Sequence, residues 1–296
     1  MKVCIIGVTG MLGHVLMEQL SLEKSLDVVG TARANVKSLE KRFSAKVFGN
    51  IRFGIDAENQ EALVHLFTEE RPDVIINCVG IIKQLPQAKK NLASININSR
   101  LPHVLALLAE GIGARVIHFS TDCIFDGKDG EYGEDTLSNA KDLYGRTKFL
   151  GELEYPHCTT IRSSIIGHEL GSSVSLVDWF LSQDRTAKGY VNAIYTGFPT
   201  LEMARILIEH ILPNPSLHGV HQISSEKINK FELLELVRNE YGVRIELVPD
   251  TTVRIDRSLD SSRFRGEAEF TPKPWERMIR EMHEHFLTSP CYFDRH

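Results

Sequence analysis

The sequence predicts an α/β fold, in which a Rossmann-type, doubly wound parallel sheet carries a smaller C-terminal α/β lobe. Two patterns support this fold class. Apolar strands alternate with helical segments through the first half of the chain, and the largely apolar run at residues 73–80 is typical of a strand covered on both faces. Glycine, asparagine, serine and threonine follow these strands directly, at the carboxyl ends where such sheets bind their ligands.

Composition excludes several classes of protein. The 296 residues are 42% apolar and 25% charged, which is ordinary for a globular protein, and the net charge of -5 argues against a nucleic-acid or anionic membrane surface. The partner is therefore expected to be a small molecule. Residues 3–6 are too short an apolar run for a signal peptide, and no stretch is long enough to span a membrane, so we expect a cytoplasmic protein.

Cysteine and histidine usage predicts no metal. The five cysteines are widely spaced and include no Cys-x-x-Cys pair, so neither a disulfide framework nor a zinc site is indicated. His283 and His285 lie two apart on a predicted helix and so point to different sides.

A glycine-rich turn follows the first predicted strand, residues 2–6, and opens a helix at residues 12–20. Glycine at every third position lets the backbone turn tightly and approach a pyrophosphate at the helix N-terminus. A plain turn is the alternative, but the preceding strand and following helix are the context that a dinucleotide site requires. The residues expected to line the cofactor here are Gly7, Thr9, Gly10, Met11, Leu12 and Gly13.

The position after the second strand, residues 27–31, selects between dinucleotides. An acid there would bind the ribose 2′-hydroxyl of NAD, but the chain has Ala32 and Arg33 and no acid before Glu40. Arg33 can pair with a 2′-phosphate; a solvated loop arginine is the alternative interpretation. We therefore expect NADPH as the cofactor, with NADH as second choice, bound by a Rossmann domain at residues 1–167.

Further residues at strand ends extend this cofactor site. A short strand is expected near residues 47–48, with helices at 61–67 and 95–109. Asp56 can accept a hydrogen bond from an adenine amine or cap the helix that follows it. Asn98 lies inside a predicted helix, where it either reaches the site or is a surface residue. The other residues assigned to the cofactor are Ile55, Cys78, Val79 and Gly80.

A hydroxyl and a Tyr/Lys pair form the candidate reaction centre. Thr121 follows the predicted strand at 115–119, while Tyr144 and Lys148 are four apart on a predicted helix and share one face. A lysine charge beneath the phenol lowers its pKa from about 10, so that the phenol can protonate a carbonyl oxygen as hydride reaches the carbon. Thr121 can give that oxygen a second hydrogen bond. The alternative is a chance Tyr-x-x-x-Lys pattern on an exposed helix.

Beyond Lys148 the elements become shorter, and we interpret residues 168–296 as a smaller substrate-binding lobe interleaved with the main sheet. Arg257 and Arg263 flank a polar segment suited to a substrate diphosphate, and Trp179 can stack on a base. Exposed arginines that bind nothing are the alternative. The expected strands are at residues 160–167, 219–223 and 244–248, and the expected helices at 200–212, 231–241 and 275–286.

These motifs together resemble the extended short-chain dehydrogenase/reductase superfamily. Within it, the STDCIFDG run at residues 120–127 looks like the dTDP-4-dehydrorhamnose reductase branch, as do the residues that follow it: Tyr132, Gly133, Glu134, Tyr144, Gly145, Lys148, Gly151 and Glu152. The resemblance covers residues 1–167 well and the remainder loosely, through residues 197–200 and 257–260.

That resemblance implies NADPH-dependent reduction of a keto group on a nucleotide-activated deoxysugar, in cell-surface polysaccharide synthesis. It implies that Tyr144 is the acid, that Lys148 tunes it and anchors the nicotinamide ribose, and that Thr121 donates to the carbonyl. It also implies substrate contacts at Asp122, Cys123 and Ser164.

The chain departs from the branch at positions that face the sugar. Cys123 stands where the family usually has Tyr, Ile165 where it has Trp, and residues 137–140 lack the usual proline. The sugar and base therefore stay open, and a reductase of a UDP-linked 2-acetamido-2,6-dideoxy-hexulose fits comparably well. A second class is the regulatory beta subunit of methionine adenosyltransferase, which binds NADP; the complete Thr/Tyr/Lys set favours the enzyme. A homodimer is compatible with the sequence.

Overall fold

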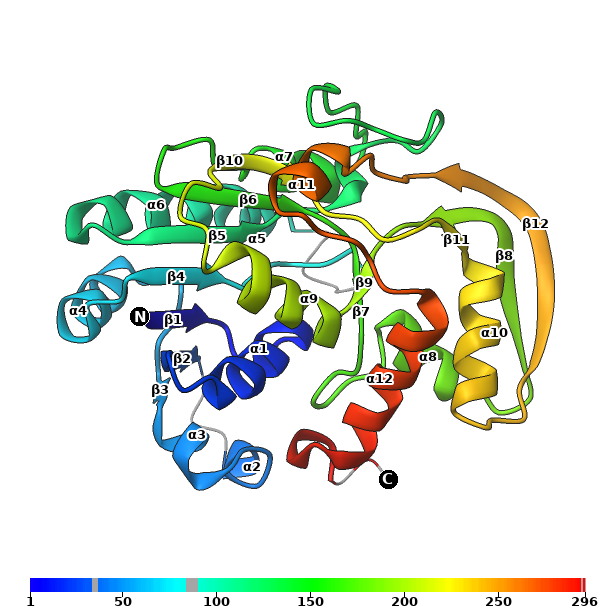
Figure 1. Cartoon of the computed structure of the whole chain (residues 1–296), viewed down its shortest axis with the longest axis horizontal. Helices are drawn as coiled ribbons and strands as arrows, with labels where there is room; N and C mark the ends of the chain where they lie inside the picture. Colours follow the sequence, from blue (N-terminus) through cyan, green and yellow to red (C-terminus); the bar gives the residue numbers. More distant parts are fainter. Residues whose placement is uncertain (34–36, 84–89, 294, 296) are drawn as a thin grey trace.

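Seven parallel strands form the central sheet, in the order β10-β6-β5-β4-β1-β2-β3 (Figure 1). The computed structural model describes residues 1–33, 37–83, 90–293 and 295. The predicted parallel sheet is confirmed, since every pairing between neighbouring strands is parallel. The strands are β1 (Lys2–Ile6), β2 (Asp27–Ala32), β3 (Ile51–Phe53), β4 (Val74–Asn77), β5 (Arg115–Phe119), β6 (Cys158–Arg162) and β10 (Gly219–Gln222).

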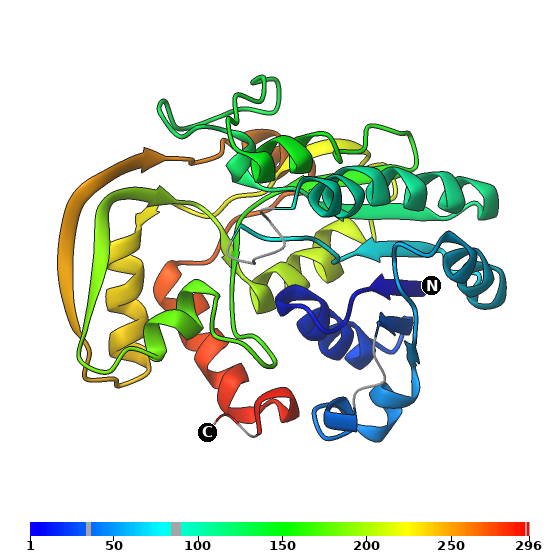
Figure 2. The same ribbon diagram turned by 180° about the vertical axis from the view of Figure 1, so that it is seen from behind.

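Helices cover both faces of this sheet (Figures 1 and 2). On one face, the buried cluster joins the strands to α1 (Met11–Leu22), α9 (Thr200–Ile206) and α12 (Trp275–Thr288). On the other, it joins them to α4 (Gln60–Glu70) and α6 (Leu101–Ile112). The predicted doubly wound fold class is therefore confirmed.

Strand β1 shows why the central strands are apolar throughout. Val3 and Ile5 belong to the first cluster, whereas Cys4 and Ile6 belong to the second. Because successive side chains of a strand point to opposite faces, a sheet buried on both sides needs an apolar residue at every position.

A smaller lobe is built around a three-stranded sheet, β11-β8-β12, at one side of the molecule (Figure 2). Its strands are β8 (Thr186–Tyr195), β11 (Ile228–Asn229) and β12 (Glu246–Asp256), and α10 (Lys230–Glu240) packs against β8. Strand β10, although later in the chain than β8, pairs with β6 in the main sheet. The boundary between residues 167 and 168 stays a prediction.

The remaining elements are mostly shorter. They are α2 (Lys37–Glu40), α3 (Ala45–Gly49), α5 (Asn91–Ser94), the π-helices η2 (Ile95–Arg100) and η4 (Leu207–Ile211), the 3₁₀-helices η3 (Asp122–Ile124) and η5 (Pro290–Tyr292), α7 (Leu143–Phe149), α8 (Leu176–Leu181), α11 (Ser262–Glu267), and the two-stranded pair β7 (Ile165–Ile166) and β9 (Phe198–Pro199).

Two expected elements differ from those observed, and one observed strand was not expected. The strand expected near residues 47–48 is wrong, because Ser44 caps helix α3 by accepting a hydrogen bond from the Val47 N–H, and β3 begins only at Ile51. The strand expected at 160–167 is two strands, β6 and β7. The long strand β8 was not predicted, since Lys188 and Gly189 interrupt its apolar pattern.

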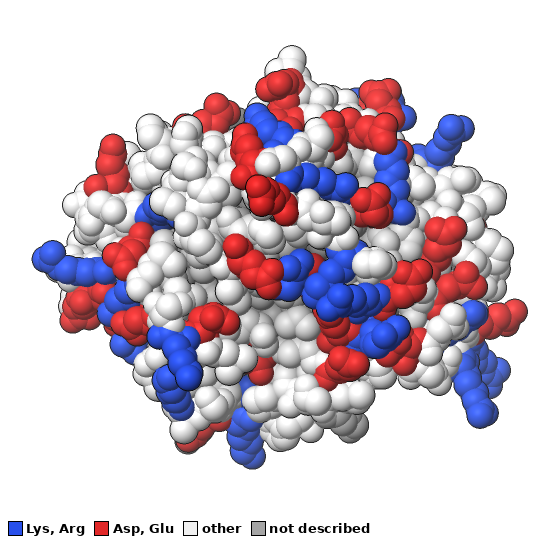
Figure 3. Space-filling view, viewed as in Figure 1, with Lys and Arg blue, Asp and Glu red and all other residues white. Residues whose placement is uncertain are grey.

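The face drawn in Figure 3 carries Lys and Arg side chains interspersed with Asp and Glu. None of the described helices is both long enough and apolar enough to cross a membrane.

Candidate active site

The hydroxyl and the Tyr/Lys pair come together beyond the end of β5. Thr121 lies two residues past that strand and caps η3, with its side chain accepting a hydrogen bond from the Cys123 N–H at 3.1 Å. Helix α7 begins at Leu143 because the Asp142 carboxylate accepts from the Gly145 N–H at 3.0 Å. These two caps therefore fix where η3 and α7 begin, and with them the positions of Thr121, Tyr144 and Lys148.

Lys148 is buried beneath this site. Its ammonium donates a hydrogen bond to the Phe119 carbonyl at the end of β5. Burial lowers the pKa of Lys148 to about 8, and the Glu152 carboxylate opposes that shift. The lysine is thus held at the end of β5, and its pKa lies closer to neutral pH than that of an exposed lysine.

Tyr144 is half-buried, and its phenol lies close to the Thr121 hydroxyl. Burial raises the pKa of Tyr144, and the nearby Cys123 and Asp122 side chains raise it further, whereas the Thr121 hydroxyl lowers it. The expected lowering of this pKa by Lys148 is not seen, because burial dominates the shift; the role of Lys148 in the reaction stays a prediction. The phenol therefore keeps its proton.

The Thr121 hydroxyl also donates to the Asp122 carboxylate at 3.2 Å. A hydroxyl has one proton to donate. A substrate carbonyl oxygen bound here would have to replace the Asp122 carboxylate as the acceptor of the Thr121 hydrogen bond.

The glycine turn forms a cradle that side chains would fill. Gly7 has a φ of +93°, and a Cβ there would lie 2.7 Å from the Val79 side chain. A Cβ on Gly13 would lie 2.1 Å from the Gly7 carbonyl oxygen, so α1 can pack this closely only with glycine. The cradle lies against Cys78, Val79 and Gly80 at the end of β4, and the residues present fit a dinucleotide.

Thr31 of β2 fixes this turn and was missed from the sequence. Its side-chain oxygen accepts the Gly7 N–H at 3.2 Å, and its carbonyl accepts the Val8 N–H at 3.0 Å. A hydroxyl on the strand beside a glycine turn is the signal that could have found it.

On the adenosine side, Arg33 is exposed just after β2, and residues 34–36 lie outside the described part of the chain. The Ile55 N–H donates to the Ala32 carbonyl at 3.2 Å, so the Ile55–Asp56 turn lies at the same sheet edge. The alternative role of Asp56 as a helix cap is wrong, because Asn59 caps α4 and Asp56 instead accepts the Glu58 N–H.

Asn98 lies inside the π-helical turn η2 and is buried rather than on the surface. Its side-chain oxygen accepts the Ile81 N–H at 2.8 Å, and its amide donates to the Ile81 carbonyl at 3.0 Å and to the Thr147 hydroxyl at 3.4 Å. It therefore joins the loop after β4 to α7, the helix that carries Tyr144 and Lys148.

A buried ion pair supports the same strand end. Arg162 contacts Glu152 through two nitrogens at 2.9 and 2.8 Å, and the Ser120 hydroxyl donates to that carboxylate at 2.6 Å. The Arg162 and Glu152 side chains are only 5% and 4% exposed. Beside them, Asn77 bonds to His118 at 3.1 Å. We did not predict these pairs, although Ser120 and Glu152 lie in the recognised motifs.

The expected substrate side gathers around Asp122 and Cys123. Burial raises the pKa of the Cys123 thiol to about 12, with Asp122 raising it and Arg257 lowering it. Arg257 itself donates to the Phe125 carbonyl at 2.8 Å. Arg257 therefore lies near the predicted site.

Tyr195 of β8 is a residue near this group that sequence reasoning missed. Burial raises its pKa, and Asp122 and Cys123 raise it further. A Cβ on Gly197 would lie 2.2 Å from both the Tyr195 hydroxyl and the Ser164 carbonyl, so Ser164 is beside it. Among the described residues this hydroxyl has no hydrogen-bond partner.

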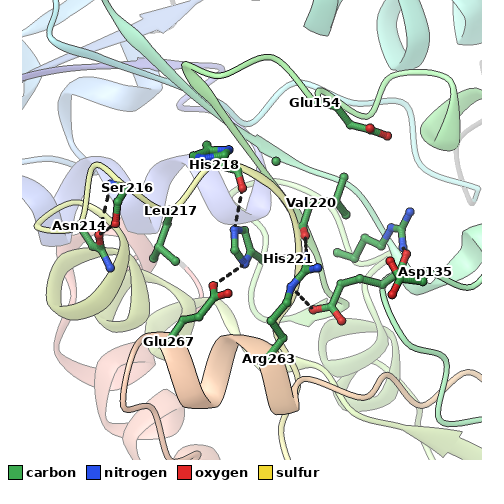
Figure 4. A pocket seen from close by; sticks show the side chains of 13 residues that line it. Asp135, Glu154, Asn214, Ser216, Leu217, His218, Val220, His221, Arg263 and Glu267 are labelled. Carbon is green, nitrogen blue, oxygen red and sulfur yellow. Dashed lines mark hydrogen bonds and ion pairs between the residues drawn. The ribbon is translucent and has the colours of Figure 1, made fainter.

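Two predicted substrate residues are not brought to this group. Trp179 lies on α8 and is 38% exposed, and no hydrogen bond or ring contact in the described part of the chain ties it to Thr121, Tyr144 or Lys148. Arg263 lies on α11 and points to the outer edge of β10 (Figure 4), where it donates to the Val220 carbonyl.

Arg263 instead lines a pocket of about 690 Å³ along the start of β10 (Figure 4). There it is 3.7 Å from the Glu134 carboxylate, which accepts the Gln222 N–H at 3.1 Å. The guanidinium is engaged by Val220 and Glu134 here, and the assignment of Arg263 to a substrate diphosphate stays a prediction.

The chain matches one protein-family model and is similar in sequence to two kinds of characterised protein. Residues 1–287 match the family model described as the RmlD substrate binding domain. The spore coat polysaccharide biosynthesis protein SpsK of Bacillus subtilis (strain 168) is 26% identical over 295 residues, 95% of this chain and 96% of that protein. Methionine adenosyltransferase 2 subunit beta of Danio rerio is 26% identical over 265 residues, 84% of this chain and 77% of that protein.

A solved structure shares the fold. The dTDP-4-dehydrorhamnose reductase of Bacillus anthracis str. Ames, determined in complex with NADP, has a TM-score of 0.77 and 19% sequence identity, covering 96% of this chain and 99% of that one.

Proposed function

We propose a function from one premise: the chain belongs to the RmlD substrate-binding domain family, whose model spans residues 1–287. The proposed activity is NADPH-dependent reduction of a keto group on a nucleotide-activated deoxysugar, in cell-surface polysaccharide synthesis. The observation that carries it is the gathering of Thr121, Tyr144 and the buried Lys148 beyond the end of β5. We place this reaction in the cytoplasm and leave the homodimer as a prediction.

The relatives support this choice of substrate class. SpsK is named for polysaccharide biosynthesis, and the Bacillus anthracis structure is a dTDP-4-dehydrorhamnose reductase with NADP bound. The glycine cradle of this chain fits the same kind of cofactor.

The proposed reaction uses the protonated phenol. Tyr144 gives its proton to the carbonyl oxygen and becomes a phenolate, whose charge Lys148 is proposed to offset. Thr121 turns its hydroxyl from Asp122 to the same oxygen. The nicotinamide, when bound, supplies the hydride to the carbonyl carbon.

The alternative is a non-catalytic, NADP-binding regulatory subunit. Its support is the 26% identity to methionine adenosyltransferase 2 subunit beta. The complete Thr121, Tyr144 and Lys148 set favours the enzyme.

A panel of dTDP- and UDP-linked 4-keto-6-deoxysugars, mixed with NADPH, tests the proposal. We expect at least one member to cause loss of the nicotinamide absorbance, with the matching hydroxyl sugar as product. If NADPH binds but no keto-sugar is reduced, the regulatory-subunit alternative is the better one.

Arg33→Ala is expected to remove most of the preference for NADPH over NADH. A charge-assisted hydrogen bond to the 2′-phosphate corresponds to roughly a 10- to 100-fold difference in affinity. The measurement is titration of wild type and variant with both cofactors. Arg185→Ala removes a second exposed arginine from the start of β8 and serves as the control. Equal wild-type affinities for the two cofactors would rule out this role for Arg33.

A further inference from the structure

The C-terminal segment of the chain is anchored along helix α1. The Glu18 carboxylate contacts His285 at 2.6 Å and accepts from the Ser289 hydroxyl at 2.7 Å. One helical turn earlier, His14 Nε2 lies 2.7 Å from the Tyr292 hydroxyl. These contacts place η5 directly behind the helix that begins at the glycine turn.

The His14 ring has a defined direction of hydrogen bonding. Its Nδ1 lies 2.8 Å from the Gly10 carbonyl, which can only accept, so Nδ1 carries the proton. The Nε2 atom of a neutral ring then accepts from the Tyr292 hydroxyl. Burial lowers the pKa of His14 to about 4, against the opposing effect of the Gly10 bond, so the ring is neutral at pH 7.

Both members of this pair are inaccessible to solvent. His14 is 0% exposed and Tyr292 is 1% exposed, and their rings also meet edge to face. The chain Tyr292 to His14 to Gly10 is therefore shielded from competing water.

The Gly10 carbonyl belongs to the same peptide unit as the Met11 N–H. In a planar trans peptide the two groups point in opposite directions, so fixing one fixes the other. Met11 is the first residue of α1, where N–H groups have no partner within the helix and face a bound anion. The Gly10 carbonyl accepts the His14 backbone N–H at 3.2 Å as well, and the His14 ring reinforces this orientation, which holds the Met11 N–H at the helix end where a pyrophosphate would bind.

We propose that Tyr292 and His14 are positioning residues for the dinucleotide, through which the C-terminal segment sets the orientation of the glycine turn. The inference rests on the cofactor part of the proposed function and is independent of the sugar. It makes cofactor affinity depend on a hydroxyl that lies 278 residues from its partner in sequence.

A matched control is present in the same aromatic cluster. The Tyr241 hydroxyl bonds to the buried His168 at 2.7 Å, and His168 in turn contacts Asp178 at 2.6 Å. Tyr241→Phe removes an equivalent tyrosine-to-histidine bond that does not touch α1 or the glycine turn.

The test measures the dissociation constant of NADPH by nicotinamide fluorescence, together with thermal unfolding. Tyr292→Phe keeps the ring and should raise the dissociation constant roughly 3- to 10-fold, the worth of one hydrogen bond. Tyr241→Phe should lower thermal stability to a similar extent and leave the dissociation constant within twofold of wild type.

A double-variant cycle distinguishes loss of the Tyr292–His14 hydrogen bond from a general loss of folding. His14→Leu should weaken NADPH binding on its own, and adding Tyr292→Phe to it should cause no further change, because the relay is already broken. An unchanged dissociation constant in Tyr292→Phe, an equal rise in Tyr241→Phe, or additive effects in the double variant would each overturn the inference. A wild type that binds NADPH but reduces no keto-sugar would remove the proposed reaction alone, and one that binds no NADPH would remove both.

Discussion

Replacing Tyr144 with Phe is expected to lower the rate of hydride transfer by roughly 10²- to 10⁴-fold, the usual contribution of general acid catalysis. The variant keeps the half-buried ring and its packing but loses the only proton that this residue can transfer. NADPH affinity should be nearly unchanged. Single-turnover reduction with saturating NADPH and a reactive keto-sugar is the measurement, because it separates the chemical step from cofactor binding.

Lys148→Met provides the contrast. It removes both the positive charge of the lysine and the hydrogen-bond donor proposed for the nicotinamide ribose, so NADPH affinity and turnover should weaken together. Hydride transfer at the wild-type rate in Tyr144→Phe would show that the Thr/Tyr/Lys set is not the reaction centre. The regulatory-subunit alternative would then be preferred.

Arg162→Met is expected to destabilise the fold by about 3–5 kcal/mol, the usual cost of removing one partner of a buried ion pair. The loss leaves Glu152 with a charge at a site where its side chain is 4% exposed. The Ser120 hydroxyl alone offers that charge too little compensation. Urea unfolding followed by circular dichroism gives the free energy of unfolding directly.

Two further variants identify the cause. Adding Glu152→Leu to Arg162→Met removes the unpaired charge and should restore much of the lost stability. Arg277→Met breaks an ion pair with Glu281 in which the arginine side chain is 62% exposed, and should change stability by less than about 1 kcal/mol. If Arg162→Met and Arg277→Met had equal effects, burial would not be what makes the Arg162–Glu152 pair important.

Local patterns predicted the glycine turn and the helix that carries Tyr144 and Lys148. The glycine turn and the Tyr144/Lys148 spacing are properties of short segments, because turn geometry and helical periodicity act between near neighbours. The apolar strand β4 was predicted for the same reason, from burial on both faces. Residues 47–48 were misassigned because the Ser44 cap, three residues before Val47, decides in favour of a helix.

The rest depends on contacts that no local pattern encodes. Tyr292 meets His14, and Tyr195 approaches Asp122, only after the chain has folded. Arg263 and Trp179 were assigned to the substrate from residue type alone, and residue type does not specify direction. The rise in the Tyr144 pKa was not predicted because its largest cause is burial, which is not visible in a local sequence pattern.

The position of Arg263 and Glu134 has a consequence for how this protein behaves at high concentration. Strand β10 is an edge strand of the main sheet, and an edge strand ordinarily offers free N–H and C=O groups to a strand from another molecule. Here the Val220 carbonyl and the Gln222 N–H are already occupied by the two side chains. Sheet extension from one molecule to the next would first have to displace a guanidinium and a carboxylate, so this charged pair protects the protein against aggregation through its outermost parallel strand.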